Sequence, residues 1–350
     1  MSSAESRHEP VRMPVRGRVR RRAWRRVSHG LHLPATKSEC GSPVRADGSA
    51  TTLDRYRQRV SPVYPTLAGG VRDVDELRAW TLLLPAGAAF THLTAAALRG
   101  WWLPLLPDYL PVFVALPNAV WRPRRKGLQV SRHTSEVAHG WLEGLPIADP
   151  AEVLLSATRH LGLLDLVVLC DSALHHRDVT IDQIRATSGL RRRGAPGLRT
   201  ALPMLDGRSE SPGETLLRLL HTTGQVRVEV QAPILDEHGQ TVARADLRIA
   251  GTRRLVEYDG AHHRDARQYE RDRARARQMQ ALGWVPYSYS ATTVRRQPQL
   301  ILRDADQALG RPADPGRLDA WHPLIQDSTF TRTGMARLRG RLGLGRRDAR

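Results

Sequence analysis

The sequence predicts an α/β protein with two parts: an α+β region over 71–205 and a C-terminal unit over 211–310 in the order αβββαβ. Two observations predict this class. In the first part, stretches of helical periodicity alternate with short apolar runs of strand length. In the second part, strand patterns cluster around turn residues and are followed by a long helical stretch and one more strand, which predicts a mixed central sheet.

The N-terminal 60 residues are rich in Arg, Ser, Gly and Pro, with eight arginines from Arg12 to Arg26 and no acid among them. This composition predicts a largely disordered arm that binds nucleic acid, with Arg25 and Arg26 as phosphate ligands. Bulky and polar residues nevertheless alternate around Ser28-His29-Gly30. That alternation predicts a short hairpin, of the kind that forms the wing of a winged-helix domain.

The α+β region contains the next elements. Thr180 is a candidate N-cap for a helix over 181–188. The predicted helices cover 73–84, 94–100, 151–174 (two buried helices) and 181–188, and the predicted strands cover 111–116 and 127–133. Trp101, Trp102 and Trp121 are expected as core or packing anchors, with base stacking as the alternative.

The C-terminal unit begins at Ser211-Pro212-Gly213-Glu214, which combines an N-cap, a first-turn proline and the acid of a capping box. The expected elements after it are strands over 226–231, 243–249, 254–258 and 284–289, with a helix over 265–282 before the last strand. Residues 311–350 are expected as a basic tail or a short amphipathic helix.

Net charge defines the expected partner. The chain carries a formal net charge of +19, which implies a polyanion such as nucleic acid, with DNA favoured. There is no signal-peptide pattern and no uninterrupted apolar span, and the two cysteines do not form a disulfide framework. We therefore expect a cytoplasmic protein without a membrane partner, and leave a homodimer or protein partner open.

The most informative stretch lies between Arg244 and His263. If Gly251-Thr252 is a two-residue hairpin loop, Asp246 faces Glu257 across the two strands, and Asp259 shares the face of Glu257. Facing carboxylates repel each other, so a proton, an arginine or a divalent cation must neutralise them. Carboxylate oxygens are ligands for Mg²⁺ or Mn²⁺, which makes these three acids candidate metal ligands.

The motifs from Ser211 to Tyr289 resemble a known domain family. An SPxE start, a D…E-x-DG-x-x-H core, a D-x-x-R helix and a final LGW are similar to the very-short-patch-repair-like domain (Vsr-like) of the restriction-endonuclease-like PD-(D/E)xK superfamily in bacterial proteins. The resemblance implies a catalytic site of Glu214, Asp246, Glu257, Asp259 and His263. It also implies Asp272 and Arg275 as supporting helix residues. Separately from the resemblance, Arg271 and Arg275 on this helix are expected to bind nucleic-acid phosphate.

A second resemblance covers 89–205, where FTHLTAAALRGWWLP and LPIADPAEVLL are similar to the C-terminal domain of AbiEi-type antitoxin and regulator proteins.

Nucleases of the first family usually carry a lysine where this chain has Asp259, and no lysine follows Lys126. That role is empty here or has passed to Arg271, Arg275 or Gln278.

Each site residue also has a structural alternative. Glu214 can complete a capping box without any catalytic role. Asp246 and Glu257 can pair with nearby arginines, and Asp259 can belong to a turn. His263 fits a proton shuttle or an exposed loop residue, and Arg271 and Arg275 fit intrahelical ion pairs.

The sequence therefore predicts a Mg²⁺-dependent endonuclease that hydrolyses phosphodiester bonds of DNA. The alternative is a non-catalytic nucleic-acid-binding regulator or antitoxin built on a degenerate nuclease fold. A third possibility is an enzyme that acts on tRNA or another RNA, which a comparison of substrates would distinguish.

Overall fold

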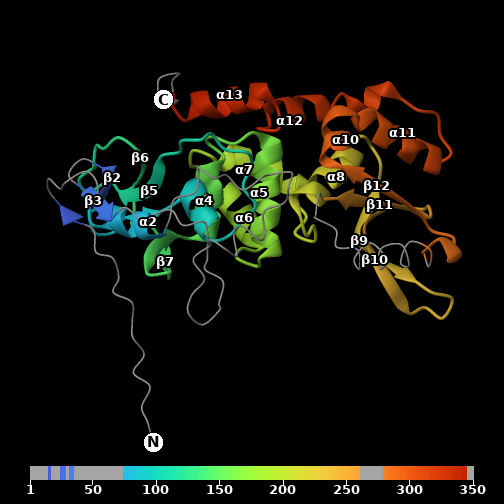
Figure 1. Cartoon of the computed structure of the whole chain (residues 1–350), viewed down its shortest axis with the longest axis horizontal. Coiled ribbons are helices and arrows are strands. Elements are labelled where there is room, and N and C mark those ends of the chain that lie inside the picture. The colour runs from blue at the N-terminus through green and yellow to red at the C-terminus, as the bar shows by residue number, and fades with distance from the viewer. Residues whose placement is uncertain are drawn as a thin grey trace, which may run out of the picture.

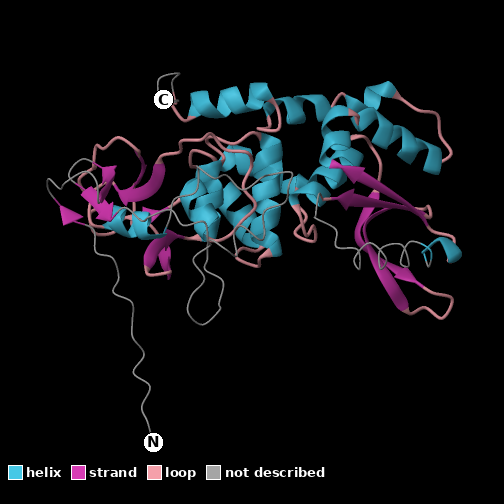
Figure 2. Cartoon of the chain, viewed as in Figure 1, coloured by secondary structure: helices cyan, strands magenta, loops and turns pink. Residues whose placement is uncertain are grey.

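The structure is a computed structural model that describes residues 15–16, 24–28, 31–34, 74–260, 277 and 279–344. These residues form a mixed α/β fold (Figures 1 and 2). The strands are β1 (Val15–Arg16), β2 (Trp24–Ser28), β3 (Leu31–Pro34), β4 (Ala89–Phe90), β5 (Val112–Pro117), β6 (Leu128–His133), β7 (His139–Leu142), β8 (Leu145–Ala148), β9 (Val228–Leu235), β10 (Thr241–Ile249), β11 (Arg254–Asp259) and β12 (Val285–Ser290). The α-helices are α2 (Val74–Thr81), α3 (His92–Leu98), α4 (Pro150–Ala157), α5 (Leu163–His175), α6 (Ile181–Ser188), α7 (Ala195–Ala201), α8 (Pro212–Thr223), α10 (Ala291–Arg296), α11 (Pro298–Ala308), α12 (Trp321–Asp327) and α13 (Arg332–Arg341). Short 3₁₀ turns cover Leu202–Met204 and Pro315–Leu318.

The described strands form three sheets, two of them of mixed polarity. A three-stranded antiparallel sheet has the order β1-β3-β2. In the five-stranded sheet, β6-β5-β4-β8-β7, the β5–β6 and β4–β8 pairs are parallel and the other two are antiparallel. In the four-stranded sheet, β12-β11-β10-β9, only the β11–β12 pair is parallel. The predicted mixed α/β class is thus confirmed.

Elements with strong local signals lie where the sequence predicts them. The hairpin around Ser28-His29-Gly30 is present as β2 and β3. Arg25 and Arg26 belong to β2, and their side chains lie outside the described part of the structure. The capping box at α6 forms in full, because Thr180 accepts a hydrogen bond from the Gln183 N–H and the Gln183 side chain accepts one from the Thr180 N–H.

The two expected parts of the chain do not have separate cores. One cluster of buried apolar side chains runs from Leu77 in α2 to Leu342 beyond α13, and it includes Leu216 and Leu220 of α8. A smaller cluster of Ile234, Ala245, Leu255 and Met279 packs on the four-stranded sheet. Helix α8 joins the parts, because one amphipathic helix packs against both α5 and the strands that follow it.

Of the two expectations for 311–350, a basic tail or a short helix, the described residues match the helix and are packed against the rest of the chain. Helices α12 and α13 lie along one long side of the molecule (Figure 1). Their junction is fixed to α5, because the buried Asp165 carboxylate accepts hydrogen bonds from Ser328 Oγ (2.6 Å) and Thr329 N (2.9 Å). Trp321 is fully buried. A few apolar side chains and one buried acceptor therefore hold a segment whose composition alone predicts a tail.

None of the described helices combines the length and apolar character that a bilayer span requires.

Candidate functional site

The hairpin of β10 and β11 has the register that the sequence predicts. Leu247 pairs with Val256 and Arg248 with Leu255, so the same register places Asp246 opposite Glu257. The loop differs from the expected two-residue turn. It covers 250–253, with the Thr252 N–H bonded to Ile249 O (3.1 Å) and Gly251 at φ +79. The observed loop is longer than the predicted one by one residue on each side, so the residues that face each other across the two strands are unchanged.

The two strands separate at the predicted acidic pair. Among the described residues of β10 and β11, ladder pairing ends at Leu247 and Val256, whereas β11 continues to pair with β12 as far as Asp259. At the separation, Asp246 Oδ2 accepts a hydrogen bond from the Tyr258 backbone N–H (2.8 Å). We call this point, defined by Asp246 and Glu257, the acidic fork. Both side chains are half-buried there.

Glu214 lies beside the acidic fork at the start of α8. Ser211 Oγ accepts the Glu214 N–H, but Glu214 Oε2 accepts the Glu210 N–H (2.7 Å) and the Gln231 side chain (2.8 Å). The capping-box explanation therefore accounts for Ser211 and not for the Glu214 carboxylate. Burial and, secondarily, the negative charge of Asp246 raise the pKa of Glu214 to about 7.

The nearest arginines on β10 have acidic partners outside the acidic fork. Arg244 pairs with Glu210 (2.5 Å), and Arg248 pairs with Glu229 across the β9–β10 ladder. Both pairs are substantially exposed, so each contributes little stability.

The third predicted ligand lies further along β11. Asp259 pairs in register with Ser290 at the end of the strand, two residues beyond Glu257 and hence about 7 Å further along. Within the described ranges, no group of three or more His, Cys, Asp or Glu side chains is arranged to hold a metal ion. The β10–β11 register thus sets Asp246 opposite Glu257, whereas Asp259 lies further along β11.

The remaining predicted site residues cannot be placed. His263, Arg271, Asp272, Arg275 and Gln278 lie outside the described residues. Residues 277 and 279–281 are helical, in agreement with the end of the helix expected over 265–282.

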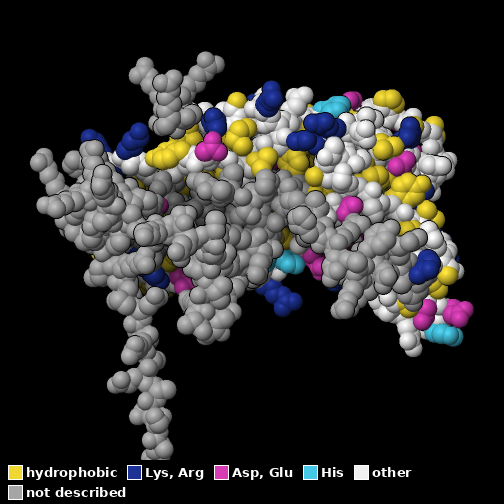
Figure 3. Space-filling model, in the orientation of Figure 1, with side chains coloured by type: hydrophobic (Ala, Val, Ile, Leu, Met, Phe, Trp, Pro, Cys, Tyr) yellow, Lys and Arg dark blue, Asp and Glu magenta, His cyan; other side chains and the backbone are white. Residues whose placement is uncertain are grey.

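Cations are displayed on the surface of the C-terminal helices. In Figure 3, Lys and Arg side chains occur along the edge of the molecule that α12 and α13 form in Figure 1. On α13, the arginines Arg332, Arg337, Arg339 and Arg341 are exposed. Two of them, Arg337 and Arg341, also pair with Asp327. The basic composition of this segment is therefore presented on a helix.

Sequence reasoning missed two features that depend on distant contacts. His92 Nε2 and His160 Nδ1 lie 2.7 Å apart in the N-terminal part, although 68 residues separate them. Burial lowers the pKa of His160 to about 4, so this pair is neutral at physiological pH. Trp101 and Trp102 are buried as expected, but Trp121 is 62% exposed, so its expected role as a packing anchor is wrong.

Glu214 should make stability depend on pH. Its folded-state pKa of about 7 lies above the unfolded value of 4.5, so its contribution is fully present below pH 4.5 and is lost as the pH rises through 7. The loss is at most about 3 kcal/mol. We expect Glu214→Gln to reduce this decline, measured by urea unfolding in EDTA between pH 5 and 8. Glu237→Gln, at a highly exposed position that does not contribute to the Glu214 pKa, serves as the control; identical pH profiles for wild type and Glu214→Gln would contradict the assignment.

Gly213 permits the close approach of α8 to β11. A Cβ atom at this position would overlap the ring of Tyr258. Alanine normally stabilises a helix by about 1 kcal/mol relative to glycine. Here we expect overpacking to dominate, so Gly213→Ala should lower the free energy of unfolding by about 1–3 kcal/mol.

Gly340→Ala is the matched control for this prediction. Gly340 is also helical, in α13, and a Cβ there meets nothing within 4 Å. It should raise the free energy of unfolding by about 0.5–1 kcal/mol. Equal stabilisation by both substitutions would show that Tyr258 does not restrict position 213.

Comparisons with known proteins add relatives without an assigned activity. No family profile matches the chain. Two proteins described as uncharacterized, one from each of two strains of Mycobacterium tuberculosis, are 35% identical to it over 109 residues, which make up 31% of this chain and 40% of each relative. The match thus spans about two fifths of the length of these curated relatives. No solved structure matches the chain.

Proposed function

We propose that the C-terminal part of this protein is a Mg²⁺-dependent phosphodiesterase that acts as an endonuclease on DNA. The observation that carries the proposal is the acidic fork, where the β10–β11 register, continued by one residue, sets Asp246 opposite Glu257 just beyond the last ladder pair. A backbone hydrogen bond orients Asp246, so its carboxylate is held in place before any ligand binds. Facing carboxylates are destabilising without a counter-charge, which is a reason to expect a cation there.

The residues present fit Mg²⁺. This ion prefers oxygen ligands, keeps several of its waters and usually takes only one or two protein carboxylates. Asp246 and Glu257 would hold it, and Asp259, at the end of β11, is a third candidate ligand. When bound, Mg²⁺ supplies a water of lowered pKa and neutralises charge that develops on the scissile phosphate.

The other residues have supporting roles in this proposal. Glu214, with its pKa near neutrality, can take up or release a proton close to Asp246. His263 is the alternative proton carrier, and Arg271 and Arg275 bind phosphate. The described order α8, β9, β10, β11 and β12, with only β11 and β12 parallel, supports the proposal that this part is restriction-endonuclease-like and Vsr-like. The AbiEi-like assignment of 89–205 also stays a proposal.

The net charge of +19 supports nucleic acid as the partner. Arg25 and Arg26 on β2 and the arginines exposed on α13 are the proposed phosphate contacts. A second function is a non-catalytic regulator or antitoxin that binds nucleic acid through the same fold. It is favoured by one specific observation, the lack of any lysine after Lys126.

A cleavage assay tests the proposal. The purified full chain is incubated with supercoiled plasmid, linear duplex, circular single-stranded DNA and folded RNA, in Mg²⁺, Mn²⁺ or EDTA. We expect cleavage of DNA with either cation and none in EDTA, and Asp246→Asn prepared in parallel controls for contaminating nucleases. If no substrate is cut under any condition while DNA is still bound, the regulator is the correct function.

A further inference from the structure

Trp121 is displayed on the surface far from the acidic fork. It belongs to the loop over 118–127, which connects the parallel strands β5 and β6. These strands and the fork strands β10 and β11 lie at opposite ends of the long axis (Figure 1). Trp121 is 62% exposed. Leaving most of a tryptophan side chain in water is unfavourable, so such a residue is a candidate for contact with a partner.

The loop that carries Trp121 is held in place from both sides. The Arg132 guanidinium on β6 donates to Val120 O (2.7 Å) and to the backbone and side-chain oxygens of Asn118. The Asn118 N–H donates to His133 O (2.7 Å), and Pro123 is buried. Because these contacts lie on either side of Trp121, the ring is presented by an ordered backbone, which lowers the entropy cost of binding.

The sequence on the C-terminal side of Trp121 is strongly basic. Arg122, Arg124 and Lys126 are exposed, Arg125 is half-buried, and no acidic residue occurs between Asp108 and Glu136. An aromatic ring flanked by cations matches a ligand that combines flat apolar rings with regularly spaced negative charges. Single-stranded nucleic acid has this chemistry, whereas a duplex keeps its base faces stacked inside.

We propose that Trp121 stacks on an unpaired base of single-stranded DNA while Arg122 and Arg124 contact the flanking phosphates. The choice of DNA over RNA rests on the proposed function; the stacking site itself rests on the loop alone. The loop thus adds a binding site for unpaired strands that is separate from the acidic fork.

Binding measured without cleavage tests this site independently of the nuclease. The full chain is titrated against a fluorescein-labelled 20-nucleotide oligothymidylate in EDTA, and anisotropy is recorded at several salt concentrations. We expect Trp121→Ala to weaken binding about tenfold, because stacking on one base contributes on this order. Trp121→Phe should retain most of the affinity. Replacing Arg122 and Arg124 together by Gln should lower the salt slope, by about 0.7 for each lost phosphate contact.

Trp141 provides the matched control. It is 72% exposed on the edge strand β7, and its sequence neighbours Gly140, Leu142 and Glu143 carry no positive charge. Trp141→Ala should therefore leave the affinity unchanged. Wild-type affinity in Trp121→Ala, an equal loss in Trp141→Ala, or equal binding of a fully paired duplex would overturn the proposal. Preference for oligouridylate over oligothymidylate would overturn the assignment to DNA. None of these readouts depends on whether the acidic fork cuts.

Discussion

Asp246→Asn is expected to reduce metal-dependent cleavage about a hundredfold or more while leaving the fold intact. Asparagine has the shape of aspartate, and its oxygen can still accept the Tyr258 N–H that the Asp246 carboxylate accepts. What it loses is the negative charge that would hold Mg²⁺. A bound metal contributes several kcal/mol of transition-state stabilisation, and each 1.36 kcal/mol corresponds to a tenfold change in rate. Glu257→Gln should have an effect of the same order.

The measurement is the initial rate of plasmid cleavage under saturating Mg²⁺, with isothermal calorimetry for Mg²⁺ binding. Glu229→Gln is the matched control, because Glu229 is an acid of the same sheet that forms an ion pair with Arg248. Its rate should stay within about twofold of wild type. Asp259→Asn shows whether the third acid takes part. Undiminished cleavage in both Asp246→Asn and Glu257→Gln would place the active site elsewhere.

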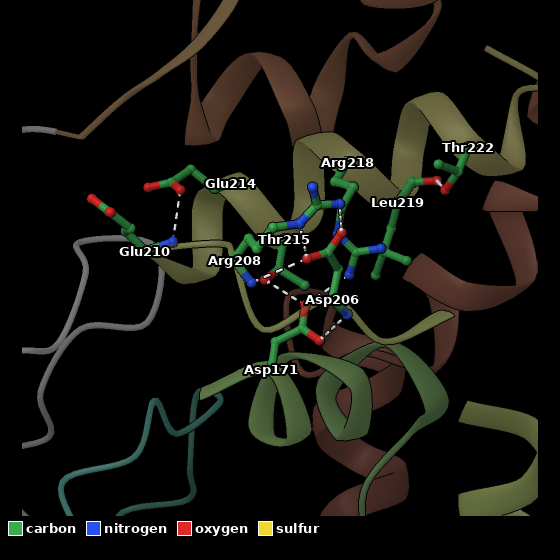
Figure 4. A network of polar contacts seen from close by, with 9 residues as sticks. All are labelled: Asp171, Asp206, Arg208, Glu210, Glu214, Thr215, Arg218, Leu219 and Thr222. Carbon is green, nitrogen blue, oxygen red and sulfur yellow. Dashed lines mark hydrogen bonds and ion pairs between the residues drawn. The ribbon is translucent and has the colours of Figure 1, made fainter. Parts of the chain in front are cut away.

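Arg218→Leu is expected to destabilise the protein by about 3–5 kcal/mol, because it leaves a buried carboxylate without its counter-charge. Asp171 on α5 is fully buried and Arg218 on α8 nearly so, and their ion pair measures 2.7 Å. Thr215 Oγ1 (3.0 Å) and the Asp206 N–H (2.8 Å) complete the donors to this carboxylate (Figure 4). The pair fixes α8 to the N-terminal part of the chain.

The pKa of Asp171 determines how the destabilisation caused by Arg218→Leu changes with pH. Burial raises its pKa to about 6, above the unfolded value of 3.8, and Arg218 opposes that rise. Asp171 therefore favours the folded state most at low pH, and this contribution is lost as the pH rises from about 4 through 6. Without Arg218 the pKa rises further, so the cost of Arg218→Leu should be smaller at pH 5 than at pH 8.

Urea unfolding at these two pH values measures the effect. The double substitution Asp171→Asn with Arg218→Leu removes both charges while the asparagine oxygen can still accept the Asp206 N–H. It should be less destabilising than Arg218→Leu alone. Arg208→Ala, which removes a 66% exposed arginine from the same network, should cost no more than about 1 kcal/mol. A cost of Arg218→Leu as small as that of Arg208→Ala would show that the buried pair contributes little.

Local signals in the sequence predicted the parts of the fold that local energy decides. The Thr180–Gln183 capping box, the Ser211 N-cap and the β2–β3 hairpin each depend on residues a few positions apart. The register of β10 and β11 was also predictable, because the turn fixes which residues face each other even when the loop is longer than expected. Asp246 and Glu257 could thus be paired from the sequence alone.

Contacts between distant residues decided what the sequence left open. The short strands β4, β7 and β8 carry too few residues for a periodic pattern, and α12 and α13 are held by Asp165, more than 160 residues away. The exposure of a side chain also depends on distant contacts. Trp101 is buried and Trp121 is not, although both are tryptophans next to other bulky or basic residues.

The sequence by itself determined the mixed α/β class and the register that sets Asp246 opposite Glu257, and its charge predicts a polyanionic partner. Each follows from composition or from the geometry of a single turn. Only the tertiary structure decided that the strands separate at this pair, that Glu214 lies beside it and that Trp121 faces water. Desolvation, charge and exposure depend on which chain segments pack together, and packing across hundreds of residues is not encoded in any local pattern.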